Sequence, residues 1–172
     1  EAPVRPIEVA ISRGEEVGLV GAANMDYSRI SARVAIVIDS GGPPSSIQGQ
    51  APYHYTYDIE VHGRAAHSSL TPQGCNAIEY AARLICHIRD LADAWRTKGP
   101  YDEAFDVPHS TITTNLITGG IAINTVPDHC AFSYEFRHLP GHAPHGIQAQ
   151  VQRYVDEELL PRMRREYEGA RI

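Results

Sequence analysis

Residues 61–76 read Val-His-Gly-Arg-Ala-Ala-His-Ser-Ser-Leu-Thr-Pro-Gln-Gly-Cys-Asn, and they join two segments of different periodicity. Before them, from Tyr53, aromatic and apolar residues alternate with polar ones, which is typical of a strand with one buried face. After them, apolar residues recur at helical spacing as far as Trp95. His67 therefore lies in a polar connection between two packed elements, a common place for a functional side chain.

Downstream of this connection the pattern continues, so that the order from residue 53 onward is strand, helix, strand, strand, helix. The predicted strands are 53–61, 110–117 and 130–137, and the predicted helices run from about Cys75 to Trp95 and from Pro144 to Pro161. Such a βαββα order is that of a ferredoxin-like split βαβ sandwich without its last strand. The segment 168–172 is a candidate for the beginning of that strand.

Two acidic sites follow apolar runs in the N-terminal part of the chain. A short buried strand is predicted at Ile7–Ile11 and is followed by Glu15 and Glu16, and a second strand at Val34–Ile38 ends at Asp39. In open α/β sheets, ligands bind at the carboxyl ends of strands, so these carboxylates are candidate site residues. Alternatively, the Glu pair begins a solvated helix and Asp39 forms a turn.

A segment rich in Gly, Pro, Ser and Gln at 41–52 is typical of a linker. It predicts two domains, 1–48 and 49–172. The sequence begins at Glu1 and not at Met, and we expect it to be part of a longer chain.

The composition is that of a globular protein, with 42% hydrophobic and 21% charged residues. A net charge of -6 argues against binding to nucleic acid or to an anionic membrane surface. No apolar run approaches the roughly 20 residues of a membrane helix. The three cysteines are far apart and form no CxxC pair, so we expect neither a disulfide framework nor a cysteine zinc site, and we expect a cytoplasmic location.

Asn124 and Arg137 are further candidates for a polar site. Asn124 follows a Gly-Gly pair and could simply be a turn residue, whereas Arg137 ends the aromatic strand and offers a planar fork that suits a carboxylate. The histidines other than His67 show neither an HExxH motif nor paired i, i+4 spacing, so we expect them to be surface residues.

Six segments, in this order, resemble motifs of the di-zinc amidohydrolase and metallopeptidase family that includes acetylornithine deacetylase, succinyl-diaminopimelate desuccinylase and peptidase T. They are Glu15–Gly18, Asp39–Gly42, Gly63–Ser69, Pro72–Ile78, Asn124–Pro127 and Phe136–Gly141. Residues 57–165 are most similar to the lid, or dimerisation, domain of acetylornithine deacetylase. Residues 14–52 are closer to peptidase T, because Asp39-Ser40-Gly41 stands where deacetylases usually carry Gly-Glu-Pro.

The resemblance implies roles for the three N-terminal carboxylates. Glu15 resembles the general base, Glu16 a ligand of one zinc ion, and Asp39 a ligand of the other. Zinc prefers carboxylate and imidazole ligands and lowers the pKa of bound water toward about 7. A neighbouring carboxylate can then move a proton to the leaving nitrogen.

The resemblance also implies roles for three lid residues. His67 resembles the lid histidine that, in dimers, reaches the partner's active site and stabilises the oxyanion. Asn124 and Arg137 resemble residues that bind the substrate, with Arg137 on its carboxylate.

These expectations describe a fragment of a zinc-dependent hydrolase of acetylornithine deacetylase type, with an α/β (α+β) fold. Its partners would be an N-acyl amino acid or short peptide, and a second copy bound through the lid. The alternatives are a peptidase T-like aminopeptidase and a dimerisation module without chemistry of its own. The family's His-x-Asp motif, bridging Asp and last zinc-binding His are not found in the 172 residues, so we expect this polypeptide alone to be inactive.

Overall fold

The computed structural model describes residues 7–14, 17, 19–34 and 53–172, and the chain divides into two compact units, Glu1–Ile47 and Gln48–Ile172. In the first unit, the described residues form a short helix α1 (Val20–Ala23) and a 3-10 turn η1 (Tyr27–Arg29). The three carboxylates predicted to act as general base or zinc ligands lie outside the described residues; they are Glu15, Glu16 and Asp39.

The predicted strand at Ile7–Ile11 is wrong. These residues have no regular secondary structure, and Ile7, Val9 and Ile11 are 78%, 80% and 89% exposed. An apolar run forms a buried strand only when neighbouring strands pair with it, and the described part of this unit contains no such strand. Of the second predicted strand, Val34–Ile38, only Val34 is described, and it is exposed.

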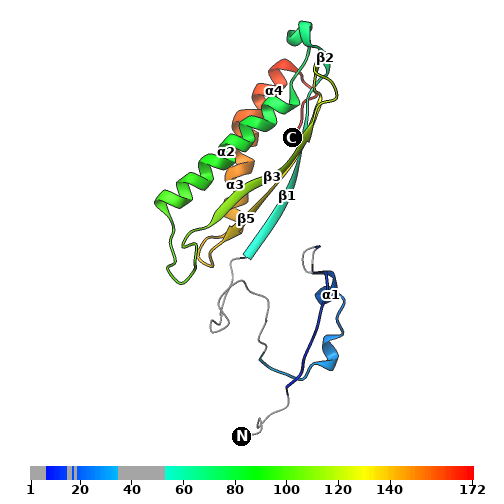
Figure 1. Cartoon of the computed structure of the whole chain (residues 1–172). Helices are drawn as coiled ribbons and strands as arrows, with labels where there is room; N and C mark the ends of the chain where they lie inside the picture. The colour runs from blue at the N-terminus through cyan, green and yellow to red at the C-terminus, as the bar shows by residue number, and fades with distance from the viewer. Residues whose placement is uncertain (1–6, 15–16, 18, 35–52) are drawn as a thin grey trace. The chain divides into compact units, whose positions relative to one another are not determined.

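The second unit is built on an antiparallel sheet in the order β1-β5-β3 (Figure 1). Its strands are β1 (Tyr53–His62), β3 (Thr111–Gly119) and β5 (His129–His138), and β5 runs antiparallel to both of its neighbours. β1 and β3 are therefore parallel to each other, and the helix α2 (Ala77–Lys98) connects them. This is the split βαβ arrangement predicted from the sequence.

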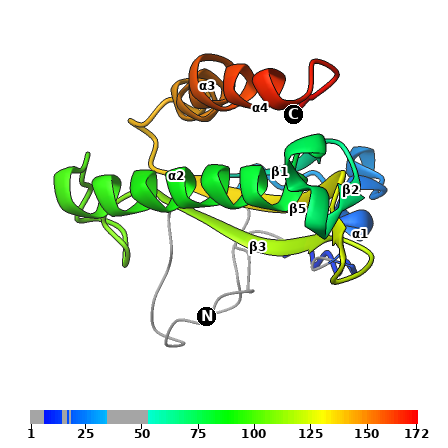
Figure 2. The same ribbon diagram turned by 90° about the horizontal axis from the view of Figure 1, so that it is seen from above.

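The helices cover one face of this sheet (Figure 2). Alternation along β5 buries Cys130, Phe132, Tyr134 and Phe136 beneath them, as predicted. β1 lies beside β5 with Val61 opposite Cys130, so that Val61, Ile59 and Tyr57 face the same core, whereas Tyr53 and Tyr55 on the same face are exposed. Glu60, His62 and other polar residues of β1 consequently lie on the opposite face.

α2 begins and ends at residues suited to helix termini. The side chain of Asn76 accepts hydrogen bonds from the backbone N–H groups of Ile78 and Glu79, at 3.1 and 3.2 Å. Gly99, at φ 73°, follows the last helical residue. Among the apolar residues at helical spacing in α2, Ala81, Ile88 and Trp95 are buried, whereas Ala82 is exposed. Tyr80 and Leu84 are also buried and complete the apolar stripe.

The last helical segment is longer than predicted. It comprises α3 (Pro144–Tyr154), a π-helical turn η3 (Val155–Leu159) and α4 (Leu160–Glu166), and it continues past Pro161. Proline lacks a donor and its ring collides with the carbonyl four residues earlier in a regular α-helix. Glu157, four residues before Pro161, lies in the wider π turn, which gives its carbonyl more room. The buried residues recur at intervals of four: Ile147, Val151, Val155, Leu159 and Met163.

The C-terminal segment reaches the free edge of β1. His62 N–H donates to Arg171 O at 2.9 Å, and Arg171 N–H donates to His62 O at 3.2 Å, which forms an antiparallel bridge. The predicted beginning of a last strand is therefore in place at Arg171, next to β1. None of the helices described is both long and apolar enough to cross a lipid bilayer.

Candidate functional site

The ladder between β1 and β5 continues beyond His62 and His129 as a narrower ribbon. There β2 (Ala66–His67) pairs with β4 (Thr125–Val126), and His67 lies opposite Thr125. Ser68 N–H donates to Asn124 O at 2.9 Å. We refer to residues 63–76 and 120–128 as the tip ribbon. It places two of the predicted site residues, His67 and Asn124, next to each other at one end of the sheet.

Small residues allow the tip ribbon to pack tightly. A Cβ atom on Gly63 would overlap the carbonyl oxygen of Cys75, and one on Gly74 would lie 2.9 Å from Val126 Cγ1. Directly after these glycines, Arg64 and Cys75 exchange two backbone hydrogen bonds of 2.9 Å. At these two positions the backbone approaches too closely for any side chain larger than that of glycine.

The imidazole of His67 is held by its own loop. His67 precedes the 3-10 turn η2 (Ser68–Gln73), and its Nδ1 accepts a hydrogen bond from Ser69 N–H at 3.2 Å, with Ser69 Oγ at 2.8 Å. A neutral imidazole that accepts at Nδ1 carries its proton on Nε2. The exposed ring of His67 therefore presents Nε2–H as a donor, which is the form suited to stabilising negative charge on a substrate oxygen.

The loop that carries Asn124 exposes apolar side chains as well as this polar one. Asn124 is exposed, and its neighbours Ile121 and Ile123 are 90% and 103% exposed. On the facing half of the tip ribbon, Leu70 is 46% exposed. The polar side chain of Asn124 therefore has exposed apolar neighbours in its loop.

Arg137 lies at the opposite end of the sheet. It is paired with His54 on β1 and Thr111 on β3, and its Nε is 3.1 Å from Glu135 Oε1. Along β5, Arg137 and His129 are separated by eight residues, which at a rise of about 3.3 Å per residue is about 26 Å. The structure therefore brings His67 and Asn124 together and keeps Arg137 apart from them.

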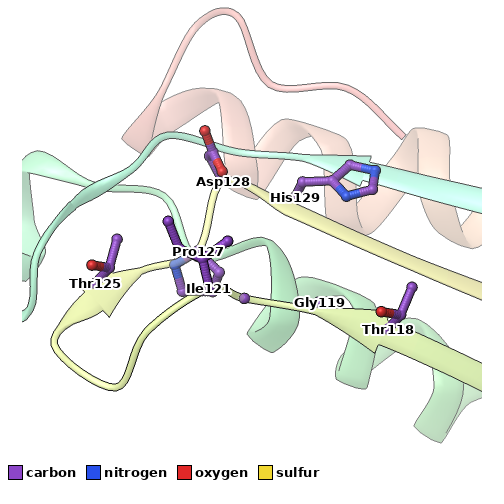
Figure 3. A pocket seen from close by; sticks show the side chains of 8 residues that line it. Thr118, Gly119, Ile121, Thr125, Pro127, Asp128 and His129 are labelled. Atoms are coloured by element: carbon purple, nitrogen blue, oxygen red, sulfur yellow. The ribbon is translucent and has the colours of Figure 1, made fainter.

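A small cavity lies at the base of the tip ribbon, where residues of the ribbon meet the end of β3 and the beginning of β5 (Figure 3). Its volume is about 140 Å³, and its lining includes Thr118, Thr125, Pro127 and His129. Pockets for small-molecule ligands are usually about 300–1,000 Å³. This cavity is too small to enclose an amino-acid substrate by itself.

Cysteine chemistry is disfavoured at Cys75 in the tip ribbon and at Cys130 beside it. Burial raises the pKa of the Cys75 thiol to about 11, and the negative charge of Glu166 adds to the increase. Burial also raises the pKa of Cys130. Because the thiolate is the reactive form, these buried thiols are poor nucleophiles and poor metal ligands.

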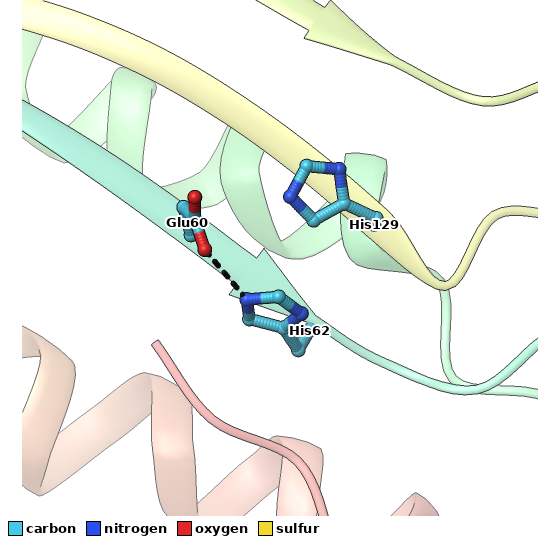
Figure 4. A group of neighbouring side chains, drawn as sticks. All are labelled: Glu60, His62 and His129. Carbon is cyan, nitrogen blue, oxygen red and sulfur yellow. Dashed lines mark hydrogen bonds and ion pairs between the residues drawn. The ribbon is translucent and has the colours of Figure 1, made fainter.

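One further group of polar side chains was not predicted from the sequence. Glu60, His62 and His129 lie together on the face of the sheet opposite the helices (Figure 4). The histidines were expected to be ordinary surface residues because helical ligand spacing is absent. The sequence does show that Glu60 and His62 are two residues apart on a strand, which places both side chains on one face of the sheet. That His129 joins them follows only from the β1–β5 register.

The comparisons with known proteins agree with this geometry. A family model described as a peptidase dimerisation domain, of the M20 type, matches residues 53–163. An acetylornithine deacetylase of Myxococcus xanthus is 33% identical over 157 residues, which are 90% of this chain and 40% of that protein. An acetylornithine deacetylase of Salmonella heidelberg (strain SL476) is 32% identical over 80% of this chain and 35% of its own length.

Among solved structures, an aminopeptidase PepT of Bacillus cereus ATCC 10987 is similar, with a TM-score of 0.61 and 29% identity over 83% of this chain and 35% of that structure. The chain thus spans about two fifths or less of the length of these relatives. The resemblance to the family of acetylornithine deacetylase and peptidase T is confirmed. The match to the family model extends from the start of β1 into α4. The chain belongs to the M20 peptidase dimerisation domain family.

Proposed function

We propose that this chain supplies the lid and dimerisation domain of a metal-dependent hydrolase that cleaves the amide of an N-acyl amino acid, of acetylornithine deacetylase type. The observation that carries the proposal is the tip ribbon, which holds His67 beside Asn124 and fixes Nε2–H of His67 as an outward donor. The 33% identity to an acetylornithine deacetylase over 90% of the chain supports the substrate class.

In this proposal the lid residues act on the two polar ends of the substrate. His67 Nε2–H donates to the oxygen that becomes negative when the amide carbonyl is attacked, and the Asn124 side chain binds beside it. Arg137 binds the α-carboxylate of the substrate with its guanidinium. Its exposed ion pair with Glu135 is compatible with this role, because such pairs contribute little and exchange easily.

The separation of these residues has a consequence for the assembly. Arg137 is about 26 Å along β5 from His129, which directly follows the tip ribbon, and this is much farther than the length of an N-acyl amino acid. One chain therefore cannot place His67 and Arg137 on the same substrate molecule in this conformation of the lid. We infer that a complete site takes Arg137 from one subunit and His67 with Asn124 from its partner.

β3 is the proposed dimerisation edge. β5 is its only strand partner among the described residues of the sheet, and on β3 Leu116 and Ile117 are 69% and 58% exposed. An edge strand with unpaired backbone groups and exposed apolar side chains is suited to pairing with a second copy across a two-fold axis.

Residues 1–48 are proposed to belong to a catalytic domain, with Glu15 as general base and with Glu16 and Asp39 as ligands of two zinc ions. Bound zinc would activate water for attack on the amide. Carboxylates suit zinc, but these two alone fall short of the usual donor set of a zinc site. We expect the 172-residue chain alone to be inactive.

Two alternatives remain as outcomes of the same assays. The similarity to an aminopeptidase PepT structure favours hydrolysis of a short peptide as the second candidate. The other alternative is a dimerisation module without chemistry of its own. A reducing, cytoplasmic location is also part of the proposal, since Cys75, Cys86 and Cys130 are all free thiols.

Subunit complementation tests the proposal. His67→Ala and Arg137→Ala are introduced separately into the full gene product, and each variant is assayed with zinc on N-acetyl-L-ornithine and on a tripeptide. Each homodimer should lose activity by about a hundredfold or more. Co-expression should restore roughly a quarter of wild-type activity, because half of the dimers are mixed and each mixed dimer has one complete site.

If co-expression restores nothing although both variants dimerise, the shared site is refuted. If the wild-type gene product hydrolyses the tripeptide and not N-acetyl-L-ornithine, the aminopeptidase alternative replaces the deacetylase. If it hydrolyses neither, the dimerisation module is what remains.

A further inference from the structure

Glu60, His62 and His129 bring a carboxylate and two imidazoles together at one point on the sheet. Their candidate ligand atoms all lie within 4.8 Å of one another, and Glu60 Oε2 is 3.0 Å from His62 Nε2. The ring centroids of His62 and His129 are 5.0 Å apart (Figure 4). We propose that these three side chains bind a divalent transition-metal ion, at a site separate from the zinc ligands that the family resemblance implies.

The fold fixes the three Cα positions before any metal binds. Glu60 and His62 alternate on one face of β1, and His62 lies directly opposite His129 in the β1–β5 ladder. The other edge of His62 is held by its backbone bridge to Arg171. The backbone that carries His62 is thus paired on both sides, which reduces the ordering that binding requires.

The distances suit small adjustments of exposed side chains. Two ligands about 2.1 Å from a zinc ion at a tetrahedral angle are about 3.4 Å apart, close to the present Glu60–His62 separation. Glu60 and His129 are exposed, so rotation of their side chains can close the remaining gap without disturbing the core. Water would occupy the remaining coordination positions at this open surface.

The donor set selects the class of ion. Two imidazoles with one carboxylate favour Zn²⁺, Ni²⁺, Co²⁺ or Cu²⁺, whereas Mg²⁺ and Ca²⁺ prefer oxygen ligands only. Arg171 lies opposite His62 in the bridge, and its positive charge opposes a cation. Its side chain is exposed, so water and salt screen that repulsion, whereas direct coordination is not screened.

The proposed metal site lies at the base of the tip ribbon, so that bound metal would affect the motion of the ribbon. His67 follows His62 by five residues, and Asn124 precedes His129 by five residues. A metal ion held by both strands would link the base of the two segments that carry His67 and Asn124. Binding should therefore restrict opening of the tip ribbon, whatever reaction the protein catalyses.

Calorimetric titration of the metal-free 172-residue chain with Zn²⁺, Ni²⁺ and Mg²⁺ tests the site. Saturable binding is expected for Zn²⁺ and Ni²⁺ and not for Mg²⁺. Glu60→Gln, His62→Asn and His129→Asn should each weaken it by about tenfold or more. His54→Asn is the matched control, because His54 lies on β1 and on the same face but at the other end of the ladder.

A double variant, Glu16→Gln with Asp39→Asn, separates this site from the proposed catalytic zinc ligands, and it should leave Ni²⁺ binding unchanged. Because bound Ni²⁺ stabilises only the native state, it should also raise the melting temperature of the wild type and not of His129→Asn. His129→Asn, at an exposed position, keeps the test valid if His62→Asn fails to fold. Equal binding by the wild type and His129→Asn, or loss of binding in the double variant alone, would overturn the proposal.

Discussion

Gly63 shows how one residue without a side chain permits the tip ribbon to form. A Cβ atom at this position would overlap the carbonyl of Cys75, whose backbone pairs with Arg64 in the next step of the ribbon. We expect Gly63→Ala to lower the free energy of unfolding by about 1–3 kcal/mol, since backbone must move. Urea denaturation followed by circular dichroism measures the change.

Gly141→Ala is the matched control for Gly63→Ala. A Cβ atom on Gly141 meets nothing within 4 Å, so the same substitution should change stability by less than about 0.5 kcal/mol. Equal losses in the two variants would show that the close approach at Gly63 has no energetic importance.

Asn76 illustrates a residue whose role is limited to the start of one helix. Its side-chain oxygen accepts from the N–H groups of Ile78 and Glu79, and its Nδ2 donates to Glu79 Oε1 at 3.0 Å. Asn76→Ala should cost about 1 kcal/mol of stability, measured in urea. Asn76→Ser keeps an acceptor and should recover most of that loss; if Ser is as destabilising as Ala, capping is not the cause.

At the scale of elements, His142 links α2 to the residues that directly precede β3 and directly follow β5. Its Nδ1 lies 2.9 Å from Ser110 Oγ, which also accepts from Leu139 N–H, and its ring packs edge-on against Trp95 at 5.0 Å. Burial lowers the pKa of His142 below its ordinary value of about 6.5, and the nearby His138 contributes to the decrease. The native state therefore disfavours protonated His142.

The sign of the resulting pH dependence follows from proton uptake. As pH falls below about 6.5, the unfolded chain binds a proton at His142 that the native chain does not, so stability is present above this pH and is lost as pH falls toward the lowered pKa. His142→Gln should lose less stability than the wild type between about pH 7 and pH 5. The slope should not vanish, since burial also lowers the pKa of His87.

Ser110→Ala separates titration from simple loss of contact. It removes the hydroxyl between His142 and Leu139 but keeps the histidine, so it should lower stability at both pH values. Denaturant titrations at the two pH values measure all three proteins. An unchanged pH slope in His142→Gln would contradict the assignment to His142.

The elements predicted correctly from the sequence are those whose own residues carry the signal, either as regular spacing of buried side chains or as a residue suited to a helix end. β5 alternates cleanly because one face is core and the other is solvent, and Asn76 marks the start of α2 by its capping chemistry. The prediction that the last helix ends at Pro161 was wrong, because a π turn before the proline lets the helix continue. Sequence spacing does not report such a local change of helical geometry.

The candidate site was predictable only in part, because strand register is a long-range property. His67 was found from its loop between two elements, yet its pairing with Thr125 and its place beside Asn124 depend on the β2–β4 register. The meeting of His129 with Glu60 depends likewise on the β1–β5 register. The wrong strand at Ile7–Ile11 has the same origin, since an apolar run does not reveal whether partner strands are present.

At the scale of the whole molecule, the proposal depends on a second copy. The tip ribbon extends from one end of the β1-β5-β3 sheet and Arg137 lies at the other end, and β3 offers an edge along which a second sheet can pair. Joining two sheets edge to edge across a two-fold axis would also bury Leu116 and Ile117. Self-association is therefore expected even for the 172-residue chain, which is expected to be inactive.

Light scattering coupled to size-exclusion chromatography tests this expectation, with a dimer having twice the 18.9 kDa mass of the chain. Ile117→Lys places a charge at the β3 edge and should shift the protein to a monomer, because burying the unpaired ammonium at the interface is costly. Ile7→Lys is the matched control, since Ile7 is 78% exposed but lies outside the sheet, and it should remain dimeric. A monomeric wild type at high concentration, or a dimer that survives Ile117→Lys, would exclude the β3 edge as the interface.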